Sequence, residues 1–301
     1  MLSFLPEPVR GVLAMFFLVT NLLFWFVFLI PFALIKICIP VPGVRKVMDF
    51  FLNLICTTWA SCNKIFLNFL NDIKFNIEGD KGLRMDEWYL VLANHQSWTD
   101  IVVLQYVLNG RIPYFRFFLK KELAWIPVFN FAWYALDYPY MQRYSKEFLK
   151  KNPHLKGKDI ETTKKSCERF KHVPVSVMNF VEGTRFTTDK HQKQASPFAH
   201  LLKPKAGGIA FVLAAMGDYL SCILDVTISY SPKAMGLWDF LCGRVTEVTV
   251  NIKKMPVTEE VKGDYFEDES FRQRFQNWVN VMWEEKDSLL TTMTGSSALN
   301  N

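Results

Sequence analysis

The stretch LVLANHQSWTD, residues 90–100, joins an uninterrupted apolar run to a cluster of polar side chains. An apolar run of this length predicts a buried strand of a parallel sheet. Ser97 and Thr99 are suited to cap a helix, and the apolar pattern that resumes directly afterwards predicts that helix. His95 therefore follows a buried strand, and Asp100 lies in the first turn of a helix. Because ligands bind at the carboxyl ends of strands in α/β sheets, we expect chemistry at this point.

His95 and Asp100 can meet only if His95 lies in the loop and Asp100 in the first helical turn, because residues five apart on a regular helix point in different directions. In that arrangement His95 is a candidate general base, and Asp100 is a candidate partner that orients the ring. The alternative is structural: His95 ends a strand, and Asp100 serves the positive end of a helix. The two residues alone do not decide between these interpretations.

A second strand-like run, VSVMNFV at residues 175–181, also ends in polar residues. Glu182, Gly183, Thr184 and Arg185 follow it directly. Glycine allows the backbone to turn sharply, and the arginine guanidinium is a planar fork that suits a phosphate group. The second run therefore predicts an anion-binding loop at the end of another strand.

Together the two stretches resemble the glycerolipid acyltransferase family, the PlsC-like lysophosphatidic acid acyltransferases. The family's Asn-His-x-Ser-x-x-Asp motif, which contains its His-x4-Asp pair, matches Asn94, His95, Ser97 and Asp100. The family's Phe-x-Glu-Gly-Thr-Arg motif matches residues 180–185. Two motifs in this order are specific for the family. Within it, the chain looks most like the bacterial YihG-type branch.

Two further motifs of the family have weaker counterparts, and the resemblance extends over roughly residues 73–255. The Phe-Ile-x-Arg motif of relatives corresponds to residues 139–143 and makes Arg143 a candidate site residue. The fourth motif usually has proline before its Val-x-Ile, and here Asp225 stands in that place. This departure bears on the acyl side of the site and not on the chemistry.

The resemblance implies a glycerol-3-phosphate acyltransferase-like fold and transfer of a fatty acyl group to the sn-2 hydroxyl of lysophosphatidic acid or another lysophospholipid. The donor would be acyl-CoA or acyl-carrier protein. His95 would take the proton of the hydroxyl, and Asp100 would hold the tautomer and stabilise the imidazolium. The hydroxyl would attack the thioester directly, without an acyl-enzyme. Ser97 has no Gly-x-Ser-x-Gly elbow around it and, like Asn94, belongs to the motif framework.

A phosphorylated acceptor needs cations, and Arg143 and Arg185 fit by residue type and motif position. With Gly183 in the turn, Glu182 and Thr184 would fix either the acceptor or the loop. We expect no cofactor besides the acyl donor, which is a substrate. We also expect no metal, because the remaining histidines lack ligand spacing. These histidines are at positions 154, 172, 191 and 200.

The N-terminal region predicts a membrane anchor. Residues 12–35 contain no charged side chain, and a helix of that length spans about 36 Å, enough to cross a bilayer. No small-residue cleavage site follows, so we expect a retained anchor over residues 1–46 instead of a signal peptide. Positive charge is heavier after the run than before it, which places the rest of the chain in the cytoplasm. With the YihG-type resemblance, this predicts the bacterial inner membrane.

The remainder divides into a helix, a catalytic domain and a tail. Residues 47–72 carry apolar side chains at helical spacing, which predicts an amphipathic helix in the membrane interface or packed on the domain. Residues 73–290 alternate strands and helices, which indicates an α/β fold with a central mixed sheet flanked by helices. The small polar residues of 291–301 predict a disordered tail. Strands are predicted near 73–78, 88–93, 113–119, 175–181, 222–229 and 245–252, and helices near 98–109, 122–134, 159–172, 206–217 and 267–286.

The composition limits the choice of partners. The formal net charge is +6, and 50% of the residues are hydrophobic, which is more apolar than a typical soluble enzyme. A basic chain binds nucleic acid or an anionic membrane, and the apolar N-terminus together with the lack of a nucleic-acid module favours the membrane. The six cysteines form no Cys-x-x-Cys pair and are typical of buried thiols in a reducing compartment.

Two other functions stay open. A lysophospholipase or thioesterase would use the same base with water in place of the alcohol. Release of free thiol that depends on an acceptor distinguishes transfer from hydrolysis. A non-catalytic membrane scaffold is disfavoured, because it has no need of His95, Asp100, Glu182 and Arg185 together.

Overall fold

A mixed sheet forms the centre of the computed structural model, which describes residues 2–120, 127–138, 140–141, 167–171, 173–232 and 236–299. Within these residues the sheet has six strands in the order β1-β8-β7-β2-β6-β3. Neighbouring strands pair in parallel except β7 and β8, which are antiparallel, so the predicted mixed α/β fold is confirmed. The strands are β1 (Lys74–Glu78), β2 (Tyr89–Ala93), β3 (Phe115–Phe117), β6 (Ser176–Phe180), β7 (Cys222–Ser231) and β8 (Glu247–Met255).

Strand β2 is buried at all five positions, because it pairs with β6 on one side and β7 on the other and helices cover both faces. Its last residue, Ala93, lies opposite Phe180 of β6 and Val226 of β7. The carboxyl ends of β2 and β6 therefore lie side by side, at the point where the polar residues of the sequence begin, and β7 continues past them to Ser231.

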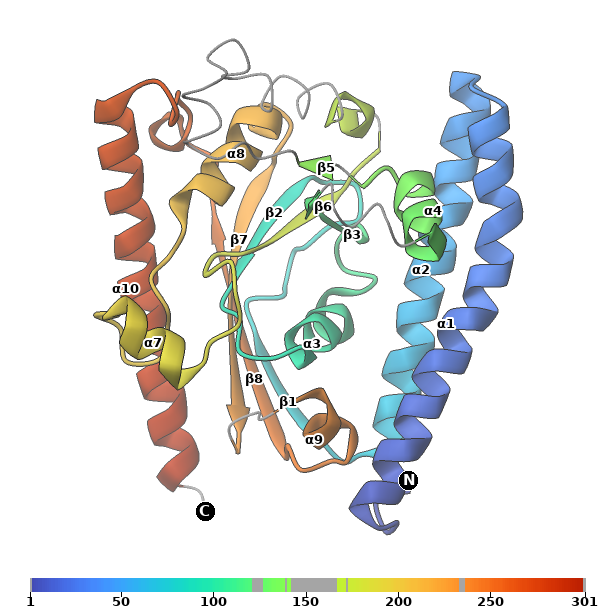
Figure 1. Cartoon of the computed structure of the whole chain (residues 1–301), viewed down its shortest axis with the longest axis horizontal. Coiled ribbons are helices and arrows are strands. Elements are labelled where there is room, and N and C mark those ends of the chain that lie inside the picture. Colours follow the sequence, from blue (N-terminus) through green and yellow to red (C-terminus); the bar gives the residue numbers. More distant parts are fainter. Residues whose placement is uncertain are drawn as a thin grey trace.

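Side chains that alternate along the strands belong to two apolar clusters, one on each face of the sheet. Leu90 and Leu92 face α8 (Ala206–Met216) and α10 (Glu269–Leu299). Val91 and Ala93 belong to the other cluster, which includes side chains of α3 (Thr99–Leu108) and α9 (Leu237–Leu241). Figure 1 shows α8 and α10 on one side of the sheet and α1 and α2 on the other.

The remaining elements are β4 (Leu119–Lys120) and β5 (Tyr140–Met141), which pair with each other, α4 (Pro127–Ala135), α7 (Thr188–Gln194) and the short 3-10 turns Glu168–Lys171 and Glu259–Val261.

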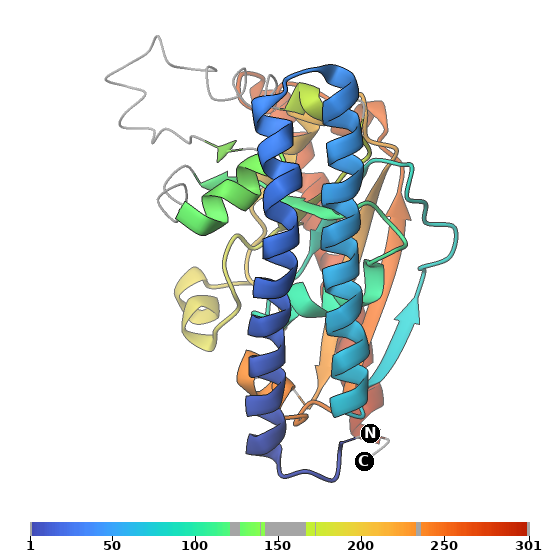
Figure 2. The same cartoon turned by 90° about the vertical axis from the view of Figure 1, so that its right-hand side faces the viewer.

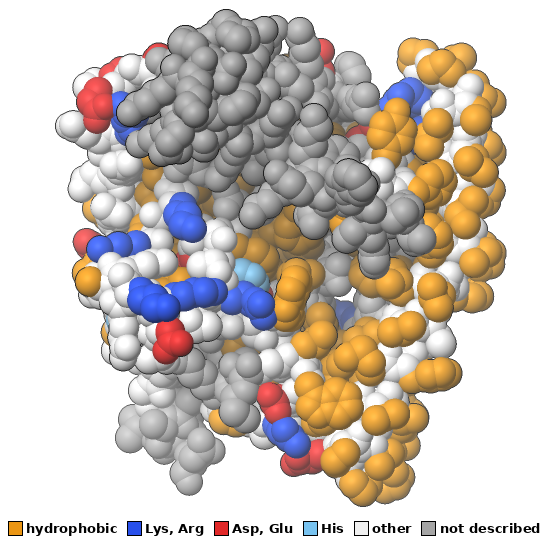
Figure 3. Space-filling view, viewed as in Figure 1, with side chains coloured by type: hydrophobic (Ala, Val, Ile, Leu, Met, Phe, Trp, Pro, Cys, Tyr) orange, Lys and Arg blue, Asp and Glu red, His pale blue; other side chains and the backbone are white. Residues whose placement is uncertain are grey.

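The N-terminal region is a hairpin of two long helices. Helices α1 (Glu7–Cys38) and α2 (Pro42–Leu70) lie side by side and are joined by a short turn (Figures 1 and 2). Both are long and apolar enough to cross a membrane by length and composition. Apolar side chains cover the outward surface of the hairpin (Figure 3). The large exposed ones include Phe16, Leu23, Phe24, Val27, Phe28, Phe50, Ile65 and Phe69.

Both ends of α1 contact the α/β domain. Near its start, Arg244 Nε donates to Glu7 Oε2 at 2.9 Å. Near its end, the Lys36 ammonium donates to the Ala135 carbonyl at 2.6 Å and forms an ion pair with Asp137. The 32 residues of α1 span about 48 Å, so the helix lies along the domain over its length. The predicted anchor over residues 1–46 corresponds to α1, and the predicted amphipathic helix over residues 47–72 corresponds to α2.

The predicted strands are present, with boundaries that differ by no more than three residues. The predicted helix near 159–172 falls mostly outside the described residues. Helix α10 continues to Leu299, into the stretch where the sequence predicts a disordered tail. Leu290 is buried, Met293 packs on the same cluster, and the Thr294 hydroxyl donates to the Leu290 carbonyl at 2.9 Å. Apolar contacts one turn apart therefore continue the helix where composition alone suggests a tail.

Candidate active site

The polar residues after β2 form a compact loop that leads into α3. His95 Nδ1 lies 2.8 Å from Asp100 Oδ2. The same oxygen accepts the backbone N–H groups of Gln96 at 2.6 Å and Ser97 at 2.9 Å. His95 thus lies in the loop and Asp100 in the first helical turn, which is the arrangement that their contact requires.

The partners of Asp100 determine the tautomer of His95. Asp100 is fully buried, and its other oxygen, Oδ1, accepts the Tyr230 hydroxyl at 2.6 Å. A carboxylate with donors on both oxygens acts only as an acceptor, so Nδ1 of His95 carries the hydrogen and Nε2 carries the lone pair. The His95 side chain is 13% exposed, so a bound molecule can reach the ring. The geometry suits a general base.

Two aromatic side chains, Phe180 and Tyr230, contact His95 and Asp100, and neither is a predicted site residue. The Phe180 ring stacks on the His95 ring, with centroids 3.9 Å apart and an interplanar angle of 14°. Burial, and secondarily the charge of Asp100, raise the pKa of the Tyr230 hydroxyl well above its ordinary value, so this group remains a donor. Tyr230 lies near the carboxyl end of β7, two residues beyond Ile228. The predicted strand ends at residue 229, so Tyr230 falls just outside it. Its position next to a predicted strand end is the one sequence feature that could have identified it as a site residue.

The loop after β6 holds the backbone of His95. Glu182 Oε1 accepts the His95 N–H at 2.8 Å, and Glu182 Oε2 accepts the Leu202 N–H at 3.1 Å. The Phe186 N–H donates to the His95 carbonyl at 2.7 Å. Gly183 has φ of 65°, a conformation that glycine adopts without strain, and it turns the chain between these two contacts. Both backbone groups of His95 are therefore bonded to this loop.

Glu182 is fully buried. Two roles are predicted for it, fixing the acceptor or fixing the loop, and this burial favours the second. Burial raises the pKa of its carboxyl to about 7, although the two N–H donors lower it. Its charge state is therefore sensitive to pH near neutrality, unlike that of an ordinary glutamate.

Arg185 is exposed beside the histidine loop, the segment of residues 94–98 between β2 and α3. Its guanidinium lies 4.9 Å from the ring of Trp98. Lys190 Nζ donates to Thr184 Oγ1 at 2.7 Å and to the Arg185 carbonyl at 3.0 Å. Figure 3 shows Lys and Arg side chains gathered beside a histidine on this face. Lys190 comes from α7, beyond the end of the sequence motif, and nothing local in the sequence separates it from other surface lysines.

Asn94 and Ser97 act within the framework of the loop. Asn94 Nδ2 donates to the Ile228 carbonyl and Asn94 Oδ1 accepts the Ile228 N–H, both at 2.9 Å. The side chain thereby continues the pairing of β2 and β7 beyond Ala93. Ser97 is buried, and its Oγ accepts the Thr99 N–H at 3.2 Å at the start of α3.

Arg143 lies outside the described residues, so its contact with an acceptor stays a prediction. Within the part of the chain that the structure describes, no group of three or more His, Cys, Asp or Glu side chains could hold a metal ion. The expectation that the protein needs neither metal nor cofactor stays a prediction as well.

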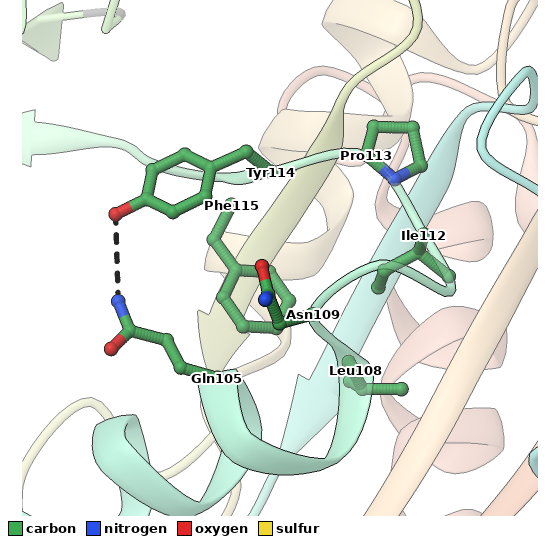
Figure 4. Close-up of a pocket in the computed structure, with 7 residues that line it drawn as sticks. All are labelled: Gln105, Leu108, Asn109, Ile112, Pro113, Tyr114 and Phe115. Atoms are coloured by element: carbon green, nitrogen blue, oxygen red, sulfur yellow. Dashed lines mark hydrogen bonds between the residues drawn. The ribbon is translucent and has the colours of Figure 1, made fainter. Parts of the chain in front are cut away.

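Two cavities differ in what they can hold. One of about 10 Å³ lies between the end of α3 and β3, where Gln105 Nε2 and the Tyr114 hydroxyl are 3.5 Å apart (Figure 4). This volume holds no more than a water molecule. The other, of about 420 Å³, lies between the hairpin and α4 and has mainly apolar walls. Its lining includes Leu22, Phe26, Leu29, Ile55, Trp59, Ala132 and Leu136.

A family model described as "Acyltransferase" matches residues 74–231, from β1 to the end of β7, and this stretch contains His95, Asp100 and the Glu182 loop. The chain belongs to this acyltransferase family. It is similar to 2-acyl-1-lysophosphatidylinositol acyltransferase of Saccharomyces cerevisiae, with 25% identity over 242 residues, 67% of this chain and 60% of the relative. It is also similar to 1-acyl-sn-glycerol-3-phosphate acyltransferase delta of Mus musculus, with 25% identity over 183 residues, 56% of this chain and 43% of the relative. The chain thus matches less than two thirds of the length of these relatives.

The acyltransferase also shares its fold with a solved structure. The crystal structure of the 1-acyl-sn-glycerophosphate (LPA) acyltransferase PlsC from Thermotoga maritima has a TM-score of 0.53 to it, at 18% sequence identity. The match covers 94% of this chain and 97% of the other, so it extends beyond the sheet into the N-terminal hairpin. The predicted family is confirmed, and the YihG-type branch stays a prediction.

Proposed function

We propose that this acyltransferase transfers a fatty acyl group from the thioester of acyl-CoA or acyl-carrier protein to the sn-2 hydroxyl of lysophosphatidic acid or another lysophospholipid. The observation that carries the proposal is the contact of His95 with the buried carboxylate of Asp100 at the carboxyl edge of the sheet. The names of the two relatives above support a lysophospholipid acceptor. The sn-2 position is supported by the second name, a 1-acyl acceptor, whereas the 2-acyl-1-lyso acceptor of the first has its free hydroxyl at sn-1.

In the proposed reaction, the acceptor hydroxyl attacks the thioester carbonyl while His95 Nε2 removes its proton. Asp100 accepts the Nδ1 hydrogen and stabilises the imidazolium that forms. Collapse of the tetrahedral intermediate breaks the carbon–sulfur bond, and the leaving thiolate takes the proton from the imidazolium. The products are the ester and the free thiol, and the histidine returns to its starting tautomer.

The acceptor phosphate would bind between Arg185 and Lys190. The Arg185 guanidinium is exposed, and stacking on Trp98 limits its orientations, which suits a two-pronged contact with phosphate. Lys190 uses two donors on Thr184 and the Arg185 carbonyl, which leaves a third N–H for a ligand.

The hairpin would bring this site to its lipid substrate. Its outward surface is apolar, and both ends of α1 are bonded to the domain, which favours a hairpin embedded in one leaflet over one that crosses the bilayer. The cytoplasmic side of the membrane remains the predicted location. The cavity of about 420 Å³ opens between the hairpin and α4, and its apolar walls suit the acyl chain of a substrate.

The test is a donor-by-acceptor matrix on the purified full-length protein in detergent. Long-chain acyl-CoA is incubated with individual lysophospholipids, and free thiol and diacyl product are measured. Thiol release that requires an acceptor and equals product formation is expected, as is its loss in His95→Gln with unchanged thermal melting. Equal thiol release without an acceptor would identify a thioesterase instead.

A further inference from the structure

The C-terminal helix α10 reaches the back of the active site, although it lies outside the stretch that the family model matches. Trp283 and Lys286, one turn apart, are among the largest fully buried side chains of the described chain. The next residue, Asp287, accepts the backbone N–H groups of Ala199 and His200, both at 2.8 Å. One face of α10 therefore contacts both the sheet and the segment that follows α7.

Lys286 places an ammonium group against the middle of β7, at the level where β2 ends. Its Nζ donates to the Val226 carbonyl at 2.6 Å and to Thr227 Oγ1 at 3.1 Å, and it lies 2.8 Å from Asp225 Oδ1. Val226 is opposite Ala93, which precedes the histidine loop. A buried ammonium is stable only when it is paired and hydrogen-bonded, and these three oxygens supply both.

Two connections lead from α10 to Glu182. Trp283 Nε1 donates to the Leu202 carbonyl at 2.9 Å, and the Leu202 N–H donates to Glu182 Oε2 at 3.1 Å. Lys286 holds the carbonyl of Val226, which lies opposite Ala93, two residues before His95, and its charge favours the ionised Glu182 carboxyl. Since the other oxygen of Glu182 holds the His95 N–H, both connections end at the proposed base.

We propose that Lys286 and Trp283 are positioning residues of the active site, which act through Glu182 on the backbone of His95. The inference rests on the proposed function, in which His95 is the base. An ionised Glu182 accepts both N–H groups in charge-assisted hydrogen bonds, whereas the hydroxyl oxygen of a protonated carboxyl is a weaker acceptor and carries a hydrogen that must point away from its N–H. Lys286 favours the ionised form of Glu182. Trp283 holds the backbone of Leu202, whose N–H donates to Glu182.

The charges around Glu182 come from several elements. Asp100 of α3 raises the pKa of the Glu182 carboxyl, and Lys286 of α10 lowers it. Asp225 of β7 pairs with Lys286, and Lys205 lies over the turn at Gly183. Without the ammonium, the buried carboxyl would take up a proton at a higher pH and hold one of its two N–H partners more weakly.

The main test replaces the pair of charges together. A single substitution would leave one charge buried and unpaired, whereas Asp225→Leu/Lys286→Met substitutes apolar side chains for both. The double variant is expected to melt within a few degrees of the wild type. Its kcat should fall about tenfold near neutral pH with both KM values unchanged, and the acid limb of its kcat profile should move to higher pH. A folded double variant with wild-type kcat and an unmoved acid limb overturns the proposal.

A second variant tests the other connection and does not depend on the first. Trp283→Phe keeps a buried ring and removes the N–H donor, and it should lower kcat about three- to tenfold at constant KM. Phe275→Leu is the matched control, since Phe275 is buried on the same helix but contacts Tyr265 and Trp278. It should lower the melting temperature and leave kcat unchanged. An equal fall of kcat in the control would show that α10 acts through stability alone, and wild-type kcat in Trp283→Phe also contradicts the inference.

Histidine NMR separates this inference from the proposed function. The ring signals of His95, assigned with His95→Gln, should shift in the double variant and in Trp283→Phe but not in Phe275→Leu. This readout needs no substrate. Failure of the proposed function would appear as a wild type without acceptor-dependent thiol release, whereas failure of the inference would appear as unshifted His95 signals.

Discussion

Replacement of Asp100 by asparagine should preserve the tautomer of His95, because the site dictates how the amide must lie. Three donors converge on Oδ2: His95 Nδ1 at 2.8 Å and the backbone N–H groups of Gln96 and Ser97 at 2.6 and 2.9 Å. The backbone groups cannot rotate, so the amide oxygen must face them. The amide NH2 then faces the Tyr230 hydroxyl, which can turn and accept.

Asp100→Asn therefore removes a charge and leaves the geometry in place. A hydrogen bond to a charged group contributes roughly 1.5–3 kcal/mol, which corresponds to about a ten- to hundredfold decrease in kcat. A histidine held in the wrong tautomer loses about 10⁴-fold. The two explanations thus differ by about two orders of magnitude, which a thiol-release assay resolves easily.

The assay compares three variants under conditions where thermal melting shows each to be folded. Tyr230→Phe alone removes one donor from Asp100. In Asp100→Asn/Tyr230→Phe the amide NH2 has lost its acceptor, which destabilises the fold by about 1–3 kcal/mol beyond the sum of the single changes. A folded Asp100→Asn protein with a ten-thousandfold loss of kcat would refute the argument. Nitrogen shifts of the His95 ring report the tautomer directly.

Three further substitutions test other parts of the site. The folded-state pKa of Glu182, about 7, lies above the ordinary value of 4.5, so the contribution of this one carboxyl to stability is largest below pH 4.5 and falls as the pH rises toward 7. Glu182→Gln should flatten this fall in thermal melts, and identical slopes would contradict it. Arg185→Lys loses the planar fork and the stacking on Trp98, and it should raise the acceptor KM about ten- to hundredfold without changing the donor KM. Equal shifts of both KM values would point to a structural role. Ala132→Trp, in the wall of the cavity of about 420 Å³, should shift the preference of a donor series toward shorter acyl chains, and an unchanged profile would exclude that cavity as the chain site.

The sheet was predictable because its signals are local. Strand β2 is an apolar run with five buried residues before the first polar one, whereas β1 and β8 alternate polar and apolar residues, and both patterns are typical of strands. The contact of His95 with Asp100 was predictable only as a possibility. It depends on where α3 begins, and the helix begins at Thr99 without a side-chain cap on its N-cap residue Trp98, so the capping pattern of Ser97 and Thr99 does not determine it.

The remaining parts of the site depend on contacts that no local pattern encodes. Tyr230 reaches Asp100 across 130 residues of sequence, and Lys286 reaches Val226 across 60. A lysine in a helix near the C-terminus is typical of a solvated surface, and only the packing of α10 on the sheet shows that Lys286 is buried. Glu182 illustrates the same limit, since its motif marks it as important but does not distinguish contact with the acceptor from support of the loop.

The hairpin shows why composition alone cannot distinguish a crossing helix from one that lies along a domain. Helix α1 meets every compositional requirement for a crossing helix. At its end, however, Lys36 is 3% exposed and bonded to the Ala135 carbonyl and Asp137. A lysine at the end of a crossing helix would extend to the lipid headgroups instead. At its start, Glu7 is bonded to Arg244, so a crossing would break one of these two sets of contacts. A hairpin held at both ends and apolar on its outward surface therefore supports the proposed single-leaflet arrangement, in which the proposed lysophospholipid acceptor would keep its chain in the membrane while its headgroup reaches the site.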